Sequence, residues 1–275
     1  MTDVAVITGG ASGFGRALAE GCAAHGMNVV VLDLDGDRAD TEAAALAAAH
    51  GVEAFGLRVD VADGAGVEAA AATVGDRFGR AHLVISNVGV QLFASIDRAT
   101  DDEWRWLLDV NVVGSARVAR AFLPLLRRAE RGRLAFTSSS SVLDPASRLS
   151  MYQASKFAVW GLAETLRVEL APEGIGVSVI FPSGMLSRHL ETSEAAQPAH
   201  LRRPIAGDDD FAAMHESNPT MAQFLATPEE AAAGVVDAIL GDRRYVVTHG
   251  EFLEALDRRE RELRAAATQA SGGTP

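Results

Sequence analysis

The chain has 275 residues, of which 48% are hydrophobic, and its formal net charge at pH 7 is −12. Its 26 glycines and 9 prolines are close to ordinary usage, which excludes a disordered, collagenous or low-complexity chain. The excess negative charge repels a phosphate backbone, so nucleic acid is not expected as a partner. The length allows a sizeable core, in one large α/β domain or two small ones.

The cysteine and histidine usage bears on the compartment and on metal binding. The single cysteine, Cys22, cannot form an internal disulfide, and the seven histidines show no metal-ligand spacing. We therefore predict no metal site. No apolar run reaches the roughly 20 residues that span a bilayer, and no basic segment precedes the first apolar stretch. These features predict a cytoplasmic protein with no membrane association.

Apolar, β-branched runs alternate with helical segments along the chain. Strands are predicted at residues 4–8, 28–33, 53–59, 82–86, 133–138, 177–181 and 245–248. Helices are predicted at residues 13–25, 36–50, 63–78, 101–128, 150–170 and 227–240. This alternation predicts an α/β fold over residues 1–250, a single domain with a doubly wound, seven-stranded parallel sheet and helices on both faces.

Two segments break the alternation. Residues 188–226 form an insertion without clear apolar periodicity, and an irregular stretch of that length is typical of a functional loop, so we expect a substrate-binding lid. Residues 251–275 are predicted to form a charged C-terminal helix and a tail. Glu254 with Arg258 and Asp257 with Arg261 have the i,i+4 spacing of ion pairs on an exposed helix.

A glycine-rich turn, TGGASGFG, occupies residues 8–15 directly after the first predicted strand. Glycine lets the backbone approach a diphosphate, which then lies against the free N–H groups and the positive end of the following helix. The turn differs from the common G-x-G-x-x-G fingerprint and is weak evidence by itself. Asp33 strengthens it, because an acidic residue at the end of the second strand can accept hydrogen bonds from the adenosine ribose. Together they predict a dinucleotide cofactor.

The same residues bear on the choice between NAD and NADP. A carboxylate at Asp33 would repel the 2′-phosphate of NADP. The turn carries Ser12 and no lysine or arginine that could pair with that phosphate. The sequence therefore favours NAD, with an NADP-linked carbonyl reductase as the alternative.

Tyr152 and Lys156 lie at i and i+4 on a predicted helix, so both side chains project from one face. A phenol with a pKa of about 10 is a poor base at neutral pH, but an adjacent ammonium stabilises the phenolate and lowers that pKa. Residues 137–141, TSSSS, follow a predicted strand at the edge where α/β sheets bind ligands. A hydroxyl there can hold a substrate oxygen, which predicts a general acid/base site.

This set of motifs resembles the short-chain dehydrogenase/reductase family, NAD(P)-binding oxidoreductases with a Rossmann fold. Residues 8–15 match its T-G-x-x-x-G-x-G pattern, and Tyr152 with Lys156 match its Y-x-x-x-K pattern. The family serine, 13 residues before the tyrosine, corresponds to Ser139, and the family asparagine corresponds to Asn111. The resemblance covers roughly residues 3–250 and implies a catalytic tetrad of Asn111, Ser139, Tyr152 and Lys156.

The turn and the resemblance together imply a set of cofactor-binding residues at successive strand ends. They are Thr8, Gly9, Ser12, Gly13, Phe14, Gly15, Asp33, Leu34, Asp60, Val61, Asn87, Val88, Gly89, Tyr152, Lys156, Pro182, Gly184 and Ser187. The chain departs from the family pattern at Val88, where a bulkier side chain replaces the usual alanine and would crowd the cofactor ribose. It also has serine at positions 183 and 187, where glycine and threonine are usual.

The resemblance implies a mechanism for alcohol oxidation. Ser139 and Tyr152 would bind the substrate hydroxyl, Tyr152 would take its proton, and hydride would pass to the nicotinamide. Lys156 would lower the pKa of the tyrosine and hold the nicotinamide ribose, while Asn111 would position a water that links Lys156 to solvent. We expect an NAD-dependent enzyme that interconverts a secondary alcohol and a ketone. A non-catalytic cofactor-binding or scaffold protein is the alternative from another class, and the intact tetrad argues against it.

The predicted substrate pocket is mostly apolar. Its expected lining residues are Gln91, Phe93, Val142, Leu143, Met151, Met185 and His189. This lining predicts a medium-sized, mostly apolar or aromatic or alicyclic alcohol or ketone. Analogy with the family implies a homodimer or homotetramer, for which Trp104, Trp106 and Trp160 are either interface anchors or core residues.

Overall fold

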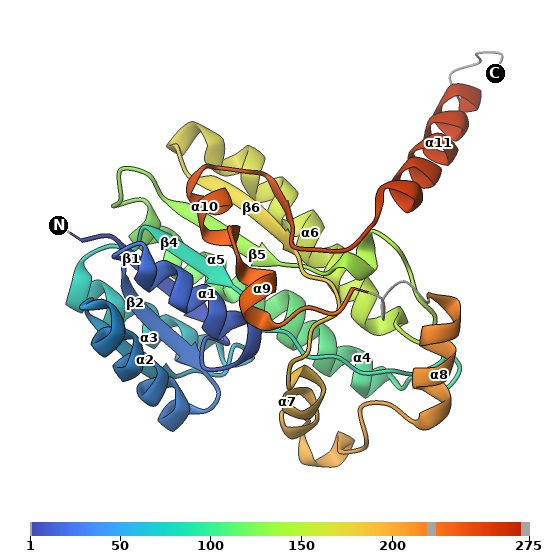
Figure 1. The fold of residues 1–275 in the computed structure, drawn as a ribbon, viewed down its shortest axis with the longest axis horizontal. Helices are drawn as coiled ribbons and strands as arrows, with labels where there is room; N and C mark the ends of the chain where they lie inside the picture. The colour runs from blue at the N-terminus through green and yellow to red at the C-terminus, as the bar shows by residue number, and fades with distance from the viewer. Residues whose placement is uncertain (1, 219–223, 271–275) are drawn as a thin grey trace.

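The computed structural model describes residues 2–218 and 224–270, and the centre of this described part is a seven-stranded sheet (Figure 1). The strands are β1 (Val4–Thr8), β2 (Asn28–Asp33), β3 (Ala54–Arg58), β4 (Leu83–Ser86), β5 (Arg133–Thr137), β6 (Gly176–Phe181) and β7 (Tyr245–Val247). Their order across the sheet is β3-β2-β1-β4-β5-β6-β7, and each neighbouring pair is parallel. The predicted doubly wound parallel sheet is confirmed.

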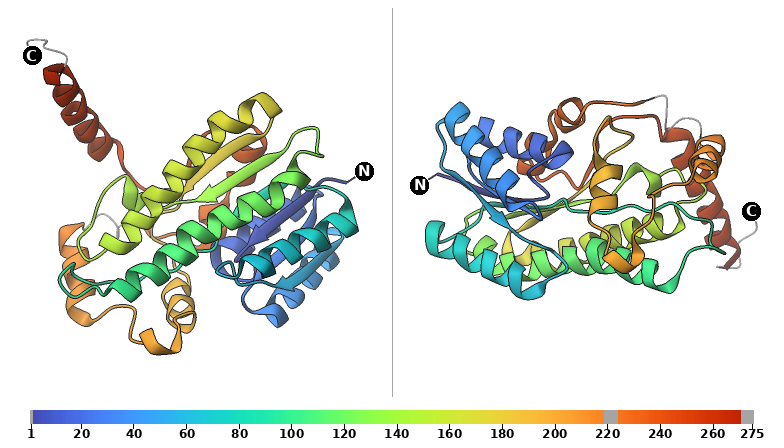
Figure 2. Two further views of the ribbon diagram at one scale, coloured as in Figure 1. Left: turned by 180° about the vertical axis from the view of Figure 1, so that it is seen from behind. Right: turned by 90° about the horizontal axis from the view of Figure 1, so that it is seen from below.

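Helices cover both faces of this sheet (Figure 2). The helices that flank it are α1 (Gly13–Ala24), α2 (Gly36–His50), α3 (Gly64–Phe78), α4 (Asp101–Leu108), α5 (Gly114–Leu126), α6 (Ser150–Leu170), α9 (Pro228–Ala232) and α10 (Val235–Leu240). Alternate residues of β1 enter two separate apolar clusters, with Val4 and Val6 in one and Ala5 and Ile7 in the other. Both faces of the central strands are therefore buried, which explains their continuous apolar runs.

Two long predicted helices are interrupted in the structure. The helix predicted at residues 101–128 consists of α4, a π-helical turn η1 (Asp109–Val113) and α5. The helix predicted at residues 227–240 divides into α9 and α10, because Ala233 leaves the helical region and Gly234 adopts a φ of 71°. A positive φ carries no steric penalty at glycine, so the chain turns at this residue.

The insertion at residues 188–226 has more regular structure than its sequence pattern indicated. It contains α7 (His189–Ala195), the short turn η4 (Ala199–Leu201) and α8 (Asp208–Ser217), while residues 219–223 lie outside the described residues. Each of these elements is short, so none repeats an apolar spacing over enough turns to be recognised in the sequence.

The predicted C-terminal helix is present as α11 (Leu253–Ala270), which projects away from the sheet in Figure 1. Arg259 on α11 donates hydrogen bonds to the carbonyl oxygens of Val142 (2.7 Å) and Leu143 (3.0 Å). The tail predicted at residues 271–275 lies outside the described residues. Within the described residues, no helix is both long and apolar enough to cross a membrane.

The close packing of α2 on β3 leads to a prediction about stability. A β-carbon on Gly56 would lie 2.3 Å from the backbone nitrogen of Asp40, so Gly56→Ala should lower the free energy of unfolding by about 1–3 kcal/mol through overpacking. Gly161→Ala is the matched control, because a β-carbon on this glycine of α6 meets no described atom within 4 Å. Urea unfolding followed by circular dichroism should show the control slightly stabilised, since alanine favours a helix by about 0.5–1 kcal/mol. Equal stability of the two variants would contradict this packing.

Candidate active site

A cavity of about 1360 Å³ opens at the carboxyl ends of the central strands, the edge where α/β sheets bind ligands. Typical pockets for a single small molecule measure about 300–1000 Å³, so this cavity has room for a dinucleotide and a second molecule. All the predicted cofactor-binding residues except Thr8 line it, and Ser139 of the predicted tetrad lines it as well.

The glycine turn exposes bare backbone to this cavity. Gly9 and Gly13 have φ values of 65° and 51°, which favour glycine. A β-carbon on Gly15 would lie 2.0 Å from the carbonyl oxygen of Gly9, so only glycine allows α1 to begin this close to the turn. The N–H groups of the first turn of α1 have no partner within a helix, and together with the helix dipole they favour an anion. The turn therefore fits the diphosphate of a dinucleotide.

Thr8 does not line the cavity, and its hydrogen bonds instead support the glycine turn. Its side chain is buried, and its hydroxyl accepts hydrogen bonds from the backbone N–H groups of Asn87 (2.9 Å) and Val88 (3.2 Å). The amide of Asn87 donates in turn to the carbonyl oxygen of Thr8 (3.2 Å). Thr8 thus joins the end of β1 to the loop after β4, which is a positioning role and differs from the predicted contact with the cofactor.

Both carboxylate oxygens of Asp33 accept backbone hydrogen bonds, one of them from the glycine turn. One accepts a hydrogen bond from the backbone N–H of Ala11 (3.1 Å) and the other from that of Asp35 (3.2 Å). Arg38, which sequence reasoning did not single out, lines the cavity too, and its backbone N–H donates to the carboxylate of Asp35 (3.1 Å). This end of the cavity therefore carries both an oriented carboxylate and a guanidinium.

Tyr152 and Lys156 project from α6 into the cavity, as their spacing predicted. The ammonium of Lys156 donates a hydrogen bond to the carbonyl oxygen of Thr137 at the end of β5 (2.9 Å) and lies 5.6 Å from the centre of the Tyr152 ring. Ser139 is 8% exposed, and its hydroxyl accepts a hydrogen bond from the backbone N–H of Ser141 (3.1 Å). Three of the four tetrad residues therefore meet in the cavity.

Burial dominates the acid–base properties of the pair. It raises the pKa of Tyr152 to about 12, although a hydrogen bond with Ser139 acts in the opposite direction. It lowers the pKa of Lys156 to about 8. Sequence reasoning predicted a lowered pKa for Tyr152 from the neighbouring ammonium. In the structure the cost of removing either charged form from water outweighs that attraction.

Asn111 lies in the π-helical turn η1 and is fully buried, outside the cavity lining. Its amide nitrogen donates to the carbonyl oxygen of Val90 and to the hydroxyl of Ser155, both at 2.9 Å, and its amide oxygen accepts from the N–H of Val90 (2.8 Å). The side chain therefore fixes the loop after β4 against α6. π-Helical turns are frequent at functional sites, but their sequences carry no distinctive signal.

The structure divides the predicted substrate residues into two groups. Gln91, Phe93, Met185 and His189 line the cavity. Val142, Leu143 and Met151 do not line it, because they are buried in the hydrophobic core. Met151 directly precedes Tyr152 on α6, and neighbouring residues on a helix point in different directions.

Trp106 of α4, which the sequence did not predict as a lining residue, also lines the cavity, as do Phe211, Met214 and Leu225 of the predicted lid. Trp160, in contrast, packs against Phe181 and Tyr245 at ring distances of 5.2 and 6.0 Å. In the described part of the chain, no group of three or more histidine, cysteine, aspartate or glutamate residues could hold a metal ion.

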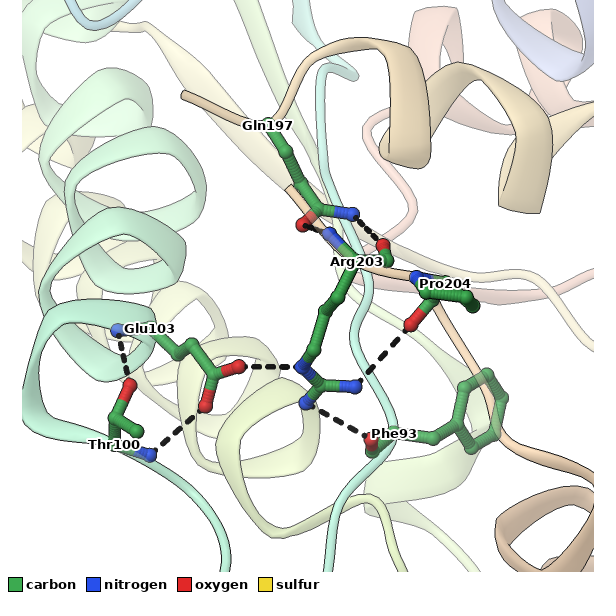
Figure 3. Close-up of polar contacts among 6 residues, drawn as sticks. All are labelled: Phe93, Thr100, Glu103, Gln197, Arg203 and Pro204. Atoms are coloured by element: carbon green, nitrogen blue, oxygen red, sulfur yellow. Dashed lines mark hydrogen bonds and ion pairs between the residues drawn. The ribbon is translucent and has the colours of Figure 1, made fainter. Parts of the chain in front are cut away.

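An ion pair with a buried carboxylate anchors the insertion to α4 (Figure 3). The guanidinium of Arg203 donates to the carboxylate of Glu103 (2.6 Å) and to the carbonyl oxygen of Phe93 (3.3 Å). Gln197 braces the backbone of Arg203 with two further hydrogen bonds. Burial would raise the pKa of Glu103, but the hydrogen bonds from Arg203 and Thr100 outweigh it and hold the pKa below its ordinary value.

In a second pair of contacts the insertion supplies the carboxylate, and the guanidinium groups come from outside it. The buried carboxylate of Asp210 in α8 pairs with the guanidinium of Arg98 and lies 3.6 Å from that of Arg148. The insertion thus supplies the cation of one pair and the anion of the other, and both hold it over the substrate end of the cavity.

Comparison with known proteins identifies the family. Residues 3–198 match the family model described as short chain dehydrogenase. The chain belongs to this family. This short-chain dehydrogenase is 33% identical over 233 residues to the short-chain reductase protein NovJ of Streptomyces niveus, across 85% of each chain. It is therefore an oxidoreductase with a Rossmann fold that binds a nicotinamide dinucleotide.

Solved structures agree with this family assignment. A short chain dehydrogenase/reductase from Burkholderia phymatum in complex with NAD has 32% identity and a TM-score of 0.86, covering 96% of this chain and 95% of its own. L-Sorbose reductase from Gluconobacter frateurii, complexed with NADPH and L-sorbose, has 27% identity and a TM-score of 0.77, covering 92% and 97%. Similar proteins thus bind either form of the cofactor.

The ion pair of Glu103 with Arg203 leads to a prediction about stability and its pH dependence. Glu103→Gln should lower the free energy of unfolding at pH 7 by about 2 kcal/mol, because it removes the charge that Arg203 pairs with. The folded-state pKa of Glu103 lies below its ordinary value of 4.5, so its stabilisation is complete above that value and is lost as the pH falls through the lower pKa. The difference between the variant and the wild type should therefore shrink in acid.

Urea unfolding at pH 7 and at successively lower pH measures this difference. Glu260→Gln is the control, because its partner Arg264 is exposed, and it should change the stability by less than about 0.5 kcal/mol. A difference that widens on acidification, or Glu103→Gln as stable as the wild type at pH 7, would show that the pair does not anchor the insertion.

Proposed function

We propose that this short-chain dehydrogenase is an NAD-dependent enzyme that interconverts a secondary alcohol and a ketone. The observation that carries the proposal is the position of Tyr152, whose phenol shares a hydrogen bond with Ser139 inside a cavity that is continuous with the glycine turn. A substrate oxygen can reach both hydroxyls there. The reacting carbon would then face the part of the cavity in which the turn and Asp33 favour a dinucleotide.

The residues around the reacting oxygen have separable roles in this proposal. Ser139 hydrogen-bonds the substrate oxygen and orients it, while Tyr152 takes the proton lost in oxidation as the phenolate and returns it in reduction as the phenol. Lys156 is fixed by the carbonyl oxygen of Thr137, so its ammonium stays beside the phenol and stabilises negative charge on it. A bound nicotinamide supplies the hydride acceptor or donor. Asn111 keeps the loop after β4 in place, and its predicted role in positioning a water stays a prediction.

The proposed preference for NAD rests on Asp33. Its carboxylate is held by two backbone N–H groups, so it cannot easily turn away from the position that the adenosine ribose would take. A 2′-phosphate there would meet negative charge. One observation favours the NADP-linked reductase as a second candidate: Arg38 lines the same cavity and could pair with that phosphate.

The proposed substrate is a medium-sized aromatic or alicyclic molecule. The substrate end is lined by large apolar side chains from the loop after β4, from α4 and from the insertion, and these favour a ring. The apolar contributors are Phe93, Trp106, Met185 and Phe211. The insertion at residues 188–226 would serve as the wall that closes over this substrate. A non-catalytic scaffold is the less favoured reading, because it has no use for the buried acid–base pair.

Tyr152→Phe tests the proposed chemistry. It should lower kcat for alcohol oxidation by about 10³-fold, because the phenylalanine ring has no proton to exchange, and it should leave the affinity for NADH within about twofold. Initial rates on a panel of aromatic and alicyclic secondary alcohols, together with a fluorescence titration of NADH, measure both quantities. The chain's other tyrosine provides the control, since Tyr245 is 40% exposed on β7, and Tyr245→Phe should keep full activity. Unchanged turnover by Tyr152→Phe would refute the assignment.

The cofactor preference is tested separately at Asp33. The wild type should bind NADH at least about tenfold more tightly than NADPH, which corresponds to roughly 1.4 kcal/mol. Asp33→Ala should lower the ratio of the two affinities, because it weakens the binding of NADH and strengthens the binding of NADPH. Asp37→Ala, on the outer side of α2 and away from the cavity, should leave this ratio unchanged. Fluorescence titration of both reduced cofactors gives the ratio. A wild type that prefers NADPH would favour the NADP-linked reductase.

A further inference from the structure

His189, the first residue of α7, faces Tyr152 across the substrate end of the cavity. The two ring centres are 6.5 Å apart and the ring planes are inclined by 58°. Among the described residues, neither ring nitrogen of His189 has a hydrogen-bond partner. Both nitrogens of this partly exposed ring are therefore available to a ligand in the cavity.

Four other histidines differ in this respect, whereas His200 and His215 also line the cavity without a hydrogen-bond partner among the described residues. His25 bonds to Gly21 and Asp237, and His50 bonds to Glu20. His82 accepts a hydrogen bond from the N–H of Val4, and His249 contacts both Thr248 and the carbonyl oxygen of Gly184. These four rings serve the fold, whereas the ring of His189 has both nitrogens available at the reacting end of the cavity.

Hydrogen bonds hold the start of α7, where His189 lies. The hydroxyl of Ser193, one turn further along α7, accepts a hydrogen bond from the backbone N–H of Gln91 (3.1 Å). The hydroxyl of Thr192 contacts the carbonyl oxygens of Arg188 (3.0 Å) and His189 (3.1 Å). The start of α7 is therefore tied to the loop after β4, which Asn111 holds in turn. A substrate would meet an imidazole at a defined distance from Tyr152.

The charge state of the imidazole decides what it can bind. Burial and the nearby ammonium of Lys156 lower the pKa of His189 to about 4. The ring is thus neutral throughout the physiological range, with one nitrogen that donates a hydrogen bond and one that accepts. The titratable groups beside the ring are the phenol of Tyr152 and the ammonium of Lys156. Such a ring matches a hydroxyl or a carbonyl group.

We propose that His189 is a specificity-determining residue that hydrogen-bonds a second oxygen of the substrate, located one or two carbons from the reacting carbon. The two rings are neighbours, with centres 6.5 Å apart, so an oxygen bound by the Tyr152 hydroxyl and an oxygen bound by an imidazole nitrogen would lie close together in one substrate. The substrate class is then a vicinally oxygenated secondary alcohol, or the matching hydroxyketone. This inference rests on the proposed function, in which Tyr152 binds the first oxygen.

Two alcohols that differ only in the second oxygen test the proposal. They are 1-phenylethane-1,2-diol and 1-phenylethanol, each oxidised at its secondary carbon with NAD at pH 7.5. The wild type should prefer the diol in kcat/KM. His189→Phe keeps a ring and removes both nitrogens, so it should lower kcat/KM for the diol by about 10- to 100-fold and change the value for 1-phenylethanol by less than about threefold.

Two further variants separate binding from folding. His189→Asn retains one donor and one acceptor and should restore part of the preference for the diol. His50→Phe removes an exposed ion pair with Glu20 at the end of α2, and it should change kcat/KM for neither alcohol. The preference of the wild type should also stay constant between pH 6 and pH 9, because His189 does not titrate there and Lys156, whose pKa is about 8, acts on both alcohols alike. A preference that changes with a midpoint near pH 6.5 would overturn the proposed neutral contact.

The remaining outcomes distinguish the two proposals. If His189→Phe lowers kcat/KM equally for both alcohols, or leaves the ratio of the two kcat/KM values unchanged, the role of His189 is overturned and the proposed reaction stands. If the wild type binds NADH but oxidises neither alcohol nor any other member of the panel, the proposed function fails, and the inference about His189 fails with it.

Discussion

A chain of hydrogen bonds across the carboxyl ends of three parallel strands supports the whole site. Lys156 donates to the backbone carbonyl of Thr137, whose hydroxyl donates to the side chain of Asn87 (3.1 Å), and the amide of Asn87 donates to the carbonyl of Thr8. These hydrogen bonds connect α6 through the ends of β5 and β4 to the end of β1, directly before the glycine turn. The part of the cavity suited to a dinucleotide and the part that holds the acid–base pair are therefore placed relative to one another by the sheet edge itself.

Desolvation sets the chemistry of the groups that line this edge. The same burial raises the pKa of Tyr152 and lowers the pKa values of Lys156 and His189, because in each case it penalises the charged form. A neutral phenol and a neutral imidazole can both exchange hydrogen bonds with uncharged oxygen atoms of a ligand. These groups fit the proposed alcohol or ketone, and apolar and aromatic side chains line the same cavity.

Two ion pairs fix the orientation of the insertion, because burying their carboxylates is favourable only when each meets its partner. Glu103 and Asp210 are buried carboxylates on opposite sides of one boundary, and each is paired with a guanidinium from the other side. Burying such a charge without its partner is strongly unfavourable, so the two pairs disfavour other placements of the insertion. This restraint reaches the cavity, because Arg203 also holds the carbonyl oxygen of Phe93, whose side chain lines the substrate end.

The sequence by itself determined the doubly wound parallel sheet and the residues expected to line the cofactor part of the cavity, because these depend on local periodicity and on motifs whose spacing is short. Tyr152 and Lys156 share a face through one helical turn, and the glycine turn is contiguous. Tertiary structure alone decided that Thr8 supports the turn, that Val142, Leu143 and Met151 face the core, and that burial raises the pKa of Tyr152. It also brought Arg203 to Glu103, 100 residues away in the chain. Such contacts depend on how separate elements pack, and side-chain direction and desolvation arise only from that packing.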